Sequence, residues 1–201
     1  MELIFQHLAV GLIERRLLNQ HKKSVRKPVY EIHGFPKDID SAHELANNVS
    51  GGRLEFQDWI IEAKIGGIVN PKKTADGGWD GHHIFNINGG KKVILIEVKS
   101  GNVNVKNLRE FIQVVNKAKA DMGVLICFEE QVTKPMKLAA KEEGYFMPDV
   151  FVNRYDKIQI LTVEELLEHK EINMSDSTIG TYKKAERVKT TDAKNQRLFE
   201  I

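Results

Sequence analysis

Three residues near the middle of the chain, Asp80, Glu97 and Lys99, have the types and spacing that metal-assisted hydrolysis requires. Side chains alternate along a β-strand, so Glu97 and Lys99 point to the same face of the strand predicted over residues 93–99. An apolar run leads directly into them, and a buried strand that ends in a carboxylate and an ammonium group incurs a desolvation cost. Asp80 stands just before the first strand of the same predicted hairpin, where it can reach the same end of the sheet.

This set predicts a metal site. The carboxylates of Asp80 and Glu97 and the backbone carbonyl of Val98 form an oxygen-only ligand set, which suits Mg²⁺ with retained waters, and Mn²⁺ as a substitute. Lys99 is placed to stabilise charge that develops at phosphorus or to position the attacking water. The spacing alone also allows a structural Glu–Lys pair beside an unrelated loop aspartate.

Two other Glu-x-Lys sequences are poor candidates for the same chemistry. Glu62 and Lys64 lie in a predicted helix, where residues two apart point about 200° away from each other. Glu168 and Lys170 follow Asp149 at an attractive spacing, but they end another predicted helix.

The elements that must position the site alternate along the chain. Hydrophobic periodicity and turn residues predict a helix over 54–65, a loop over 70–78, and strands over 84–88 and 93–99 joined at Gly89-Gly90. After this hairpin they predict a helix over 105–120, a buried strand over 122–128, a helix over 134–143, strands over 150–152 and 157–162, and a helix over 163–169 capped by Thr162. The order predicts a small α/β domain with a central mixed β-sheet flanked by helices.

Three regions are expected. Residues 1–50 form an N-terminal extension, with a helix over 2–19, a short strand over 28–33 and a helix capped by Ser41 that runs to Ala46. Residues 51–170 form the α/β domain, and residues 171–201 form a polar tail.

The composition excludes several classes of protein. The chain has 201 residues, of which 41% are hydrophobic and 29% charged, as in globular proteins. The single cysteine, Cys127, excludes a disulfide framework and a multi-cysteine zinc site, and its apolar surroundings predict an inert buried thiol. No apolar stretch approaches the ~20 residues of a membrane span, and the N-terminus lacks the pattern of a secretory signal, so we expect a soluble cytoplasmic protein.

The net charge of +2 is unevenly distributed. Residues 64–119 contain ten basic and four acidic residues, a balance of +6, which leaves −4 for the rest of the chain. A basic middle is consistent with a polyanionic partner, although charge alone favours a solvated lysine-rich surface.

The chain resembles the PD-(D/E)xK nuclease superfamily, most closely its Mrr-like restriction endonuclease branch. Over residues 29–199 it is similar to the C-terminal region found behind many bacterial DNA methyltransferases. The stretches that carry the resemblance are Tyr30–Pro36, Phe56–Trp59, Gly77–Gly81, Ile96–Gly101, Val105–Val115, Thr133–Met136 and Lys157–Thr162. The resemblance implies a restriction-endonuclease-like core, a divalent metal and DNA as the substrate.

The chain departs from the family's pattern at two positions. Trp79 precedes Asp80 where the motif has proline, and Gln57 stands where the preceding helix often offers an acidic residue. Glu97 is a better metal ligand than the glutamine that relatives behind methyltransferases often carry. The glycine motif that binds S-adenosylmethionine is missing, so methylation by this chain alone is not expected.

Further residues have supporting roles in this interpretation. Lys72 and Lys73 in the loop before Asp80, and Lys106 at the start of the following helix, are candidates for contacts with DNA phosphates, or are solvated surface lysines. Gln57 and Gln113 are candidate supporting residues. His82 and His83 are expected to have surface or packing roles.

We therefore expect a Mg²⁺-dependent endonuclease that cleaves DNA in restriction or another defence against foreign DNA. Cutting both strands of a duplex needs two sites, so a homodimer is plausible. Two alternatives stay open: a catalytically silent DNA-binding module that works with a methyltransferase, and an unrelated α/β protein whose Glu97–Lys99 pair is structural.

Overall fold

A computed structural model describes residues 4–21, 32–72, 77–87, 90–148 and 153–174 of the chain. Its helices are α1 (Ile4–His21), α2 (Ile39–Asn47), α3 (Gly52–Asp58), the π-helix η1 (Trp59–Ile65), α4 (Val105–Lys117), the 3₁₀ turn η2 (Glu129–Gln131), α5 (Lys134–Glu142) and α6 (Val163–Leu167). Its strands are β1 (Ile68–Val69), β2 (Gly81–Ile87), β3 (Gly90–Val98), β4 (Met122–Cys127), β5 (Tyr145–Phe146), β6 (Tyr155–Asp156) and β7 (Ile158–Thr162).

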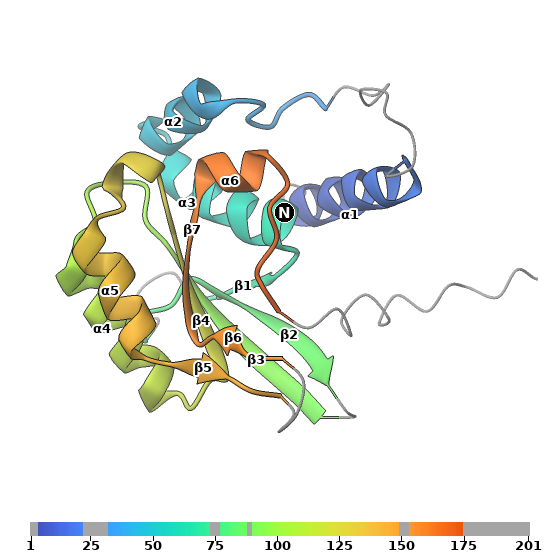
Figure 1. The fold of residues 1–201 in the computed structure, drawn as a ribbon. Helices are drawn as coiled ribbons and strands as arrows, with labels where there is room; N and C mark the ends of the chain where they lie inside the picture. The colour runs from blue at the N-terminus through green and yellow to red at the C-terminus, as the bar shows by residue number, and fades with distance from the viewer. Residues whose placement is uncertain (1–3, 22–31, 73–76, 88–89, 149–152, 175–201) are drawn as a thin grey trace, which may run out of the picture.

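The central sheet has five strands in the order β1-β2-β3-β4-β7 (Figure 1). Strands β1, β2 and β3 pair antiparallel, whereas β3, β4 and β7 pair parallel, with α4 and α5 as the crossovers. A separate two-stranded sheet joins β5 to β6. The prediction of an α/β fold with a mixed sheet flanked by helices is confirmed.

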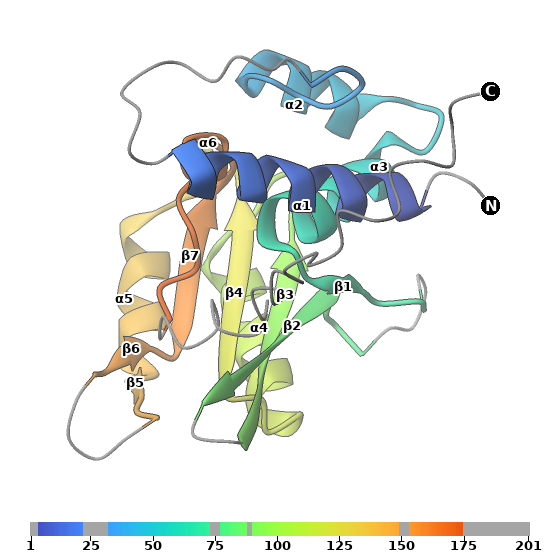
Figure 2. The ribbon, with the colours of Figure 1, turned by 90° about the vertical axis from the view of Figure 1, so that its right-hand side faces the viewer.

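Two apolar layers enclose the sheet, because alternate residues of β3 face opposite sides. Ile94, Ile96 and Val98 belong to the cluster under η1, whereas Leu95 belongs to the cluster under α4 and α5. Figure 2 shows α1 and η1 in front of the strands, with α4 and α5 behind them. Glu97 is two residues after Leu95 and on the same face of β3, so it lies on the α4 side.

The N-terminal elements share the core of the α/β unit. Ala42 and Ala46 of α2 lie in the same buried cluster as Phe56 and Trp59. The expected boundary after residue 50 therefore separates segments that pack into one core. None of the helices in the described ranges has the length and apolar character that a bilayer span requires.

Several predicted elements need correction or lie outside the described residues. The single helix expected over 54–65 is α3 followed by a π-helix. Ser41 is not the N-cap of α2: Asp38 is, because its carboxylate accepts the Ser41 N–H while the Ser41 hydroxyl accepts the Asp38 N–H. The helix expected to reach residue 120 ends at Lys117. Ile32 and His33 are not in a strand, and residues 28–31, the expected strand over 150–152 and the tail from 175 onward are outside the described residues.

Candidate functional site

A glycine turn brings Asp80 to the sheet. Gly77 and Gly78 have φ angles of 80° and 87°, which side-chain-bearing residues rarely adopt. A Cβ atom on Gly78 would lie 2.8 Å from Val114 of α4, so the turn packs closely against that helix. Asn70 fixes the other side of the turn with two hydrogen bonds. Its side-chain Nδ2 donates to the carbonyl oxygen of Trp79 at 3.1 Å, and its backbone N–H donates to the carbonyl oxygen of Asp80 at 2.8 Å.

Asp80 closes the end of the β2–β3 pair. Its backbone N–H donates to the carbonyl of Ile96 at 2.8 Å, and its carboxylate oxygen Oδ2 accepts the backbone N–H of Val98 at 2.7 Å. The register pairs Gly81 with Ile96, so Asp80 stands next to Glu97 across the two strands. Paired residues of neighbouring strands share a face, and this places the two carboxylates together.

Glu97 is a buried carboxylate with one satisfied oxygen. Its Oε1 lies 2.7 Å from Nζ of Lys99, as expected for two residues on one face of a strand. Its Oε2 is buried and has no hydrogen-bond partner. Burial raises the pKa of the Glu97 carboxyl above its ordinary value of 4.5; the Lys99 ammonium opposes this effect, and the nearby charges of Asp80 and Glu110 add to it.

The oxygen atoms present fit a hard divalent cation. Buried polar atoms are nearly always hydrogen-bonded, and the Oε2 of Glu97, which has no such partner among the described residues, could serve as a ligand oxygen. Mg²⁺ is typically held by one or two carboxylates with several waters, which Asp80 and Glu97 can supply. No cluster of three or more histidine, cysteine, aspartate or glutamate side chains suited to a metal ion occurs in the ranges that the structure describes. The third expected ligand, Val98, is a buried residue at the end of β3.

The two histidines of β2 face opposite sides of the sheet. Nδ1 of His83 lies 3.2 Å from the carbonyl oxygen of Gly66, on the η1 side. His82 packs edge-on against Trp79, with 5.6 Å between ring centroids, and its Nδ1 is buried without a hydrogen-bond partner. Burial lowers the pKa of both imidazoles. Both contacts are of the packing kind that the sequence predicts.

The expected supporting residues are spread over both sides of the sheet. Gln57 is buried in α3, in the layer opposite α4, and Gln113 is exposed on α4. Lys106 is exposed at the first turn of α4, with Nζ 3.9 Å from a Glu110 oxygen. Lys72 is exposed, and its backbone N–H donates to the side chain of Asn70 at 3.1 Å. Lys73 is outside the described residues.

The other two Glu-x-Lys sequences do not join this site. Glu62 and Lys64 lie on η1 and contact α1: Glu62 is 4.0 Å from Nδ1 of His7, and Lys64 is 3.7 Å from Glu14. Glu168 and Lys170 follow α6, which ends at Leu167, and Asp149 is outside the described residues.

Sequence reasoning missed Asn70, which anchors the turn before Asp80. Its only signal was its place at the start of the loop predicted over 70–78. By contrast, the prediction of a buried thiol at Cys127 is confirmed: the side chain is fully buried in β4, and burial raises its pKa to about 12.

Comparison with known protein families gives a match over much of the α/β unit. The model of the NACHT-associated inactive restriction endonuclease 1 family covers residues 54–168, more than half of the chain, from α3 through α6. The matched region contains the hairpin with Asp80, Glu97 and Lys99, and both crossover helices. A search of curated proteins and a search of solved structures each gave no match. The alternative of an unrelated α/β protein is therefore wrong: the chain has a restriction-endonuclease-like domain and belongs to the NACHT-associated inactive restriction endonuclease 1 family.

Proposed function

We propose that this domain binds DNA and hydrolyses its phosphodiester bonds with a divalent metal ion, Mg²⁺ or Mn²⁺, held by Asp80 and Glu97. The observation that carries the proposal is the buried Oε2 of Glu97, which has no hydrogen-bond partner although it lies beside a second carboxylate and a lysine. A purely structural Glu–Lys pair gains nothing from a desolvated oxygen left unsatisfied.

Each residue has a defined task in this mechanism. Asp80 and Glu97 supply the ligand oxygens, and the carbonyl of Val98 is the proposed third ligand. A bound divalent ion supplies Lewis-acid polarisation of the phosphate and a water of lowered pKa. The Lys99 ammonium, which now donates to Glu97, is placed to donate to the attacking water or to a phosphate oxygen on which charge develops.

DNA is the proposed substrate because two exposed lysines stand on the segments next to the site. Lys72 is tethered through Asn70 to the turn that carries Asp80, and Lys106 opens the helix that follows β3. Such exposed lysines neutralise backbone phosphates and set affinity without reading sequence. From the resemblance to Mrr-like enzymes that the sequence predicts, we propose restriction or a related defence as the biological role, and a homodimer as the form that cuts both strands.

A second candidate function is a catalytically silent nuclease-fold module that binds DNA beside a methyltransferase. The family's description as inactive favours it. So do two contacts in the site: Lys99 occupies one oxygen of Glu97, and Val98 occupies one oxygen of Asp80. In the family's pattern an acidic residue of the preceding helix adds a ligand, and this chain has the neutral Gln57 at the matching sequence position.

Incubation of the purified chain with methylated and unmethylated plasmid, in Mg²⁺ or Mn²⁺, separates the two candidates. We expect metal-dependent cutting that EDTA stops and that Lys99→Ala abolishes while DNA binding persists. Calorimetry should show weaker metal binding by Asp80→Asn. If neither plasmid is cut but DNA binding depends on Lys72 and Lys106, the silent module is the correct function. If the Lys99→Ala variant cuts as well as the native chain, the assignment of the site is wrong.

A further inference from the structure

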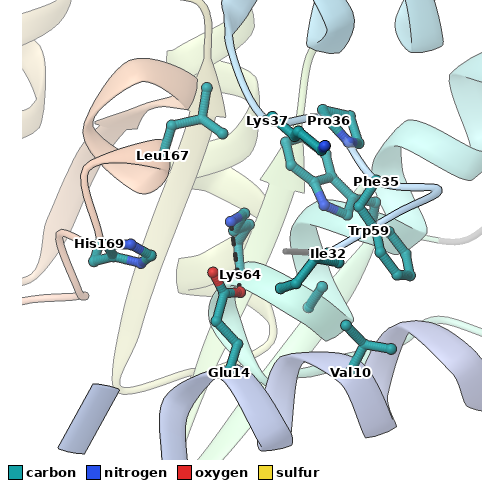
Figure 3. Close-up of a pocket in the computed structure, with 11 residues that line it drawn as sticks. Val10, Glu14, Ile32, Phe35, Pro36, Lys37, Trp59, Lys64, Leu167 and His169 are labelled. Carbon is teal, nitrogen blue, oxygen red and sulfur yellow. Dashed lines mark ion pairs between the residues drawn. The ribbon is translucent and has the colours of Figure 1, made fainter. Parts of the chain in front are cut away.

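A cavity lies on the opposite side of the sheet from Asp80 and Glu97. It has a volume of about 230 Å³ and lies between α1, η1, the segment over 32–37 and the end of α6 (Figure 3). Apolar side chains line it from opposite sides, with Phe35 and Trp59 across from Leu167 (Figure 3), and its polar lining residues include Glu14, Lys37, Lys64 and His169.

The cavity is lined both by residues that the family model covers and by residues outside its range. Trp59, Lys64 and Leu167 lie within the matched range 54–168, whereas Val10, Glu14 and Phe35 precede it. The cavity therefore exists only because α1 and the segment over 32–37 pack against η1. That makes it a feature separate from the nuclease-like site.

The π-helix aims two side chains at this cavity. In an α-helix, residues 59 and 64 would point about 140° apart, because each residue turns the chain by 100°. The i→i+5 bonding of η1 instead stacks them on one side, and Nζ of Lys64 lies 5.7 Å from the centroid of the Trp59 ring. π-Helical turns are rare and occur often at functional sites.

The ion pair in the cavity is a loose one. Nζ of Lys64 and an oxygen of Glu14 are 3.7 Å apart, which is longer than a charge-assisted hydrogen bond, yet the side chains are only 11% and 15% exposed. Removing two charges from water without a close bond between them is unfavourable. Lys64 is held in place by its backbone as well, because the Arg15 guanidinium donates to the Lys64 carbonyl at 2.7 Å.

We propose that this cavity binds a small organic anion with an apolar body. Lys64, with Lys37 and His169 at the margin, receives the carboxylate or phosphate group, and the apolar side chains of Val10, Phe35 and Leu167 receive the body from both sides. Glu14 is the group that the ligand's anion displaces from Lys64. The cavity is slightly smaller than the ~300 Å³ lower bound of drug-sized pockets, so the ligand is the size of a single substituted ring.

Calorimetric titration of the full chain in EDTA, with benzoate and phenyl phosphate as anionic probes and benzamide as the neutral control, tests the proposal. We expect the anions to bind at least about tenfold more tightly than benzamide, the ratio that a hydrogen bond to a charged group implies. Glu14→Gln should bind benzoate more tightly than the native chain, since Lys64 no longer has a competing carboxylate.

Three matched variants complete the test. The double variant Glu14→Gln/Lys64→Met removes both charges and leaves neither uncompensated, and it should lose at least about tenfold in affinity. Leu167→Trp should block binding by filling the cavity. Lys99→Ala, on the other side of the sheet, should bind benzoate as the native chain does. Failure of both anions to bind, equal binding of benzamide, or unchanged affinity in the double variant would each overturn the proposal.

Discussion

The carboxylate of Asp80 accepts the backbone N–H of Val98 at 2.7 Å, so a side chain expected to bind metal also completes the hydrogen bonding of strand β3. In an antiparallel pair this N–H would ordinarily find a carbonyl on the neighbouring strand. Here β2 begins only at Gly81, and the side chain of the preceding residue takes over. The stability of the hairpin and the chemistry of the site therefore share one carboxylate.

Asp80→Ala and Asp80→Asn should differ in stability. The alanine variant leaves the N–H of Val98, a residue 1% exposed, without an acceptor, which costs about 1–3 kcal/mol. The asparagine variant keeps an acceptor oxygen and should unfold close to the native chain, although it too should lose metal-dependent cleavage. Urea unfolding measures the difference, and equal stability of the two variants would show that the hydrogen bond to Val98 contributes nothing.

Glu97→Gln should stabilise the protein increasingly as the pH rises. The pKa of Glu97 is higher in the folded protein than its ordinary value of 4.5, so the folded state holds this proton more firmly than the unfolded state. The contribution of the group to stability is therefore greatest in acid and falls as the pH rises from about 4.5 through the folded-state pKa. The amide does not ionise and still offers Lys99 an oxygen.

Unfolding free energies of the native and Glu97→Gln chains between pH 4 and 8 measure this effect. The difference in favour of the variant should grow with pH and then level off. Glu44→Gln, at an exposed position of α2, is the matched control for the substitution itself. A variant that becomes relatively less stable at higher pH would mean that the Lys99 ion pair outweighs the burial of Glu97.

Lys72→Ala and Lys106→Ala should each weaken DNA binding and reduce its dependence on salt. A lysine that neutralises one phosphate contributes about 0.9 to the slope of log affinity against log salt concentration. Lys141, exposed at the C-terminal end of α5 and thus at the opposite end of the sheet from Val98, is the matched control. Fluorescence anisotropy at four or five salt concentrations gives the slopes. Equal slopes for all three variants would place the DNA elsewhere.

The arrangement of Asp80, Glu97 and Lys99 was accessible from the sequence because it depends on short-range rules. The two-residue period of a strand puts Glu97 and Lys99 on one face, and the Gly89-Gly90 turn signal brings Asp80 back to the same end. The structure brings these groups together, and their catalytic roles stay a prediction. Asn70 could not be identified in this way, because its role depends on hydrogen bonds to a turn nine residues away.

The π-helix η1 and the N-cap of α2 could not be predicted from the sequence for a different reason. The apolar positions from Trp59 to Ile65 suit a helix, but periodicity cannot separate i→i+4 from i→i+5 bonding over seven residues. The choice depends on tertiary packing, and η1 packs against α1. Likewise Asp38 and Ser41 are both good capping residues, and only the backbone shows that Asp38 precedes the helix.

Gly11→Ala should lower the melting temperature, because α1 and η1 are in backbone contact. A Cβ atom at Gly11 would lie 2.6 Å from the carbonyl oxygen of Ala63, and a backbone atom cannot move aside as a flexible side chain can. Overpacking of this kind costs about 1–3 kcal/mol. Within a helix that does not pack there, the same substitution would instead stabilise by about 1 kcal/mol, because alanine favours helix over glycine. The sign of the change thus reports whether α1 is docked.

Thermal unfolding of Gly11→Ala beside Ala9→Gly makes this test quantitative. Ala9 is exposed on α1, so its replacement by glycine measures helix propensity alone and should lower stability by about 1 kcal/mol. If α1 is docked on η1, both variants should melt below the native chain, because at position 11 the close contact with Ala63 outweighs the higher helix propensity of alanine. If Gly11→Ala melts above the native chain, α1 does not pack on η1, and the cavity between them loses the wall that carries Glu14.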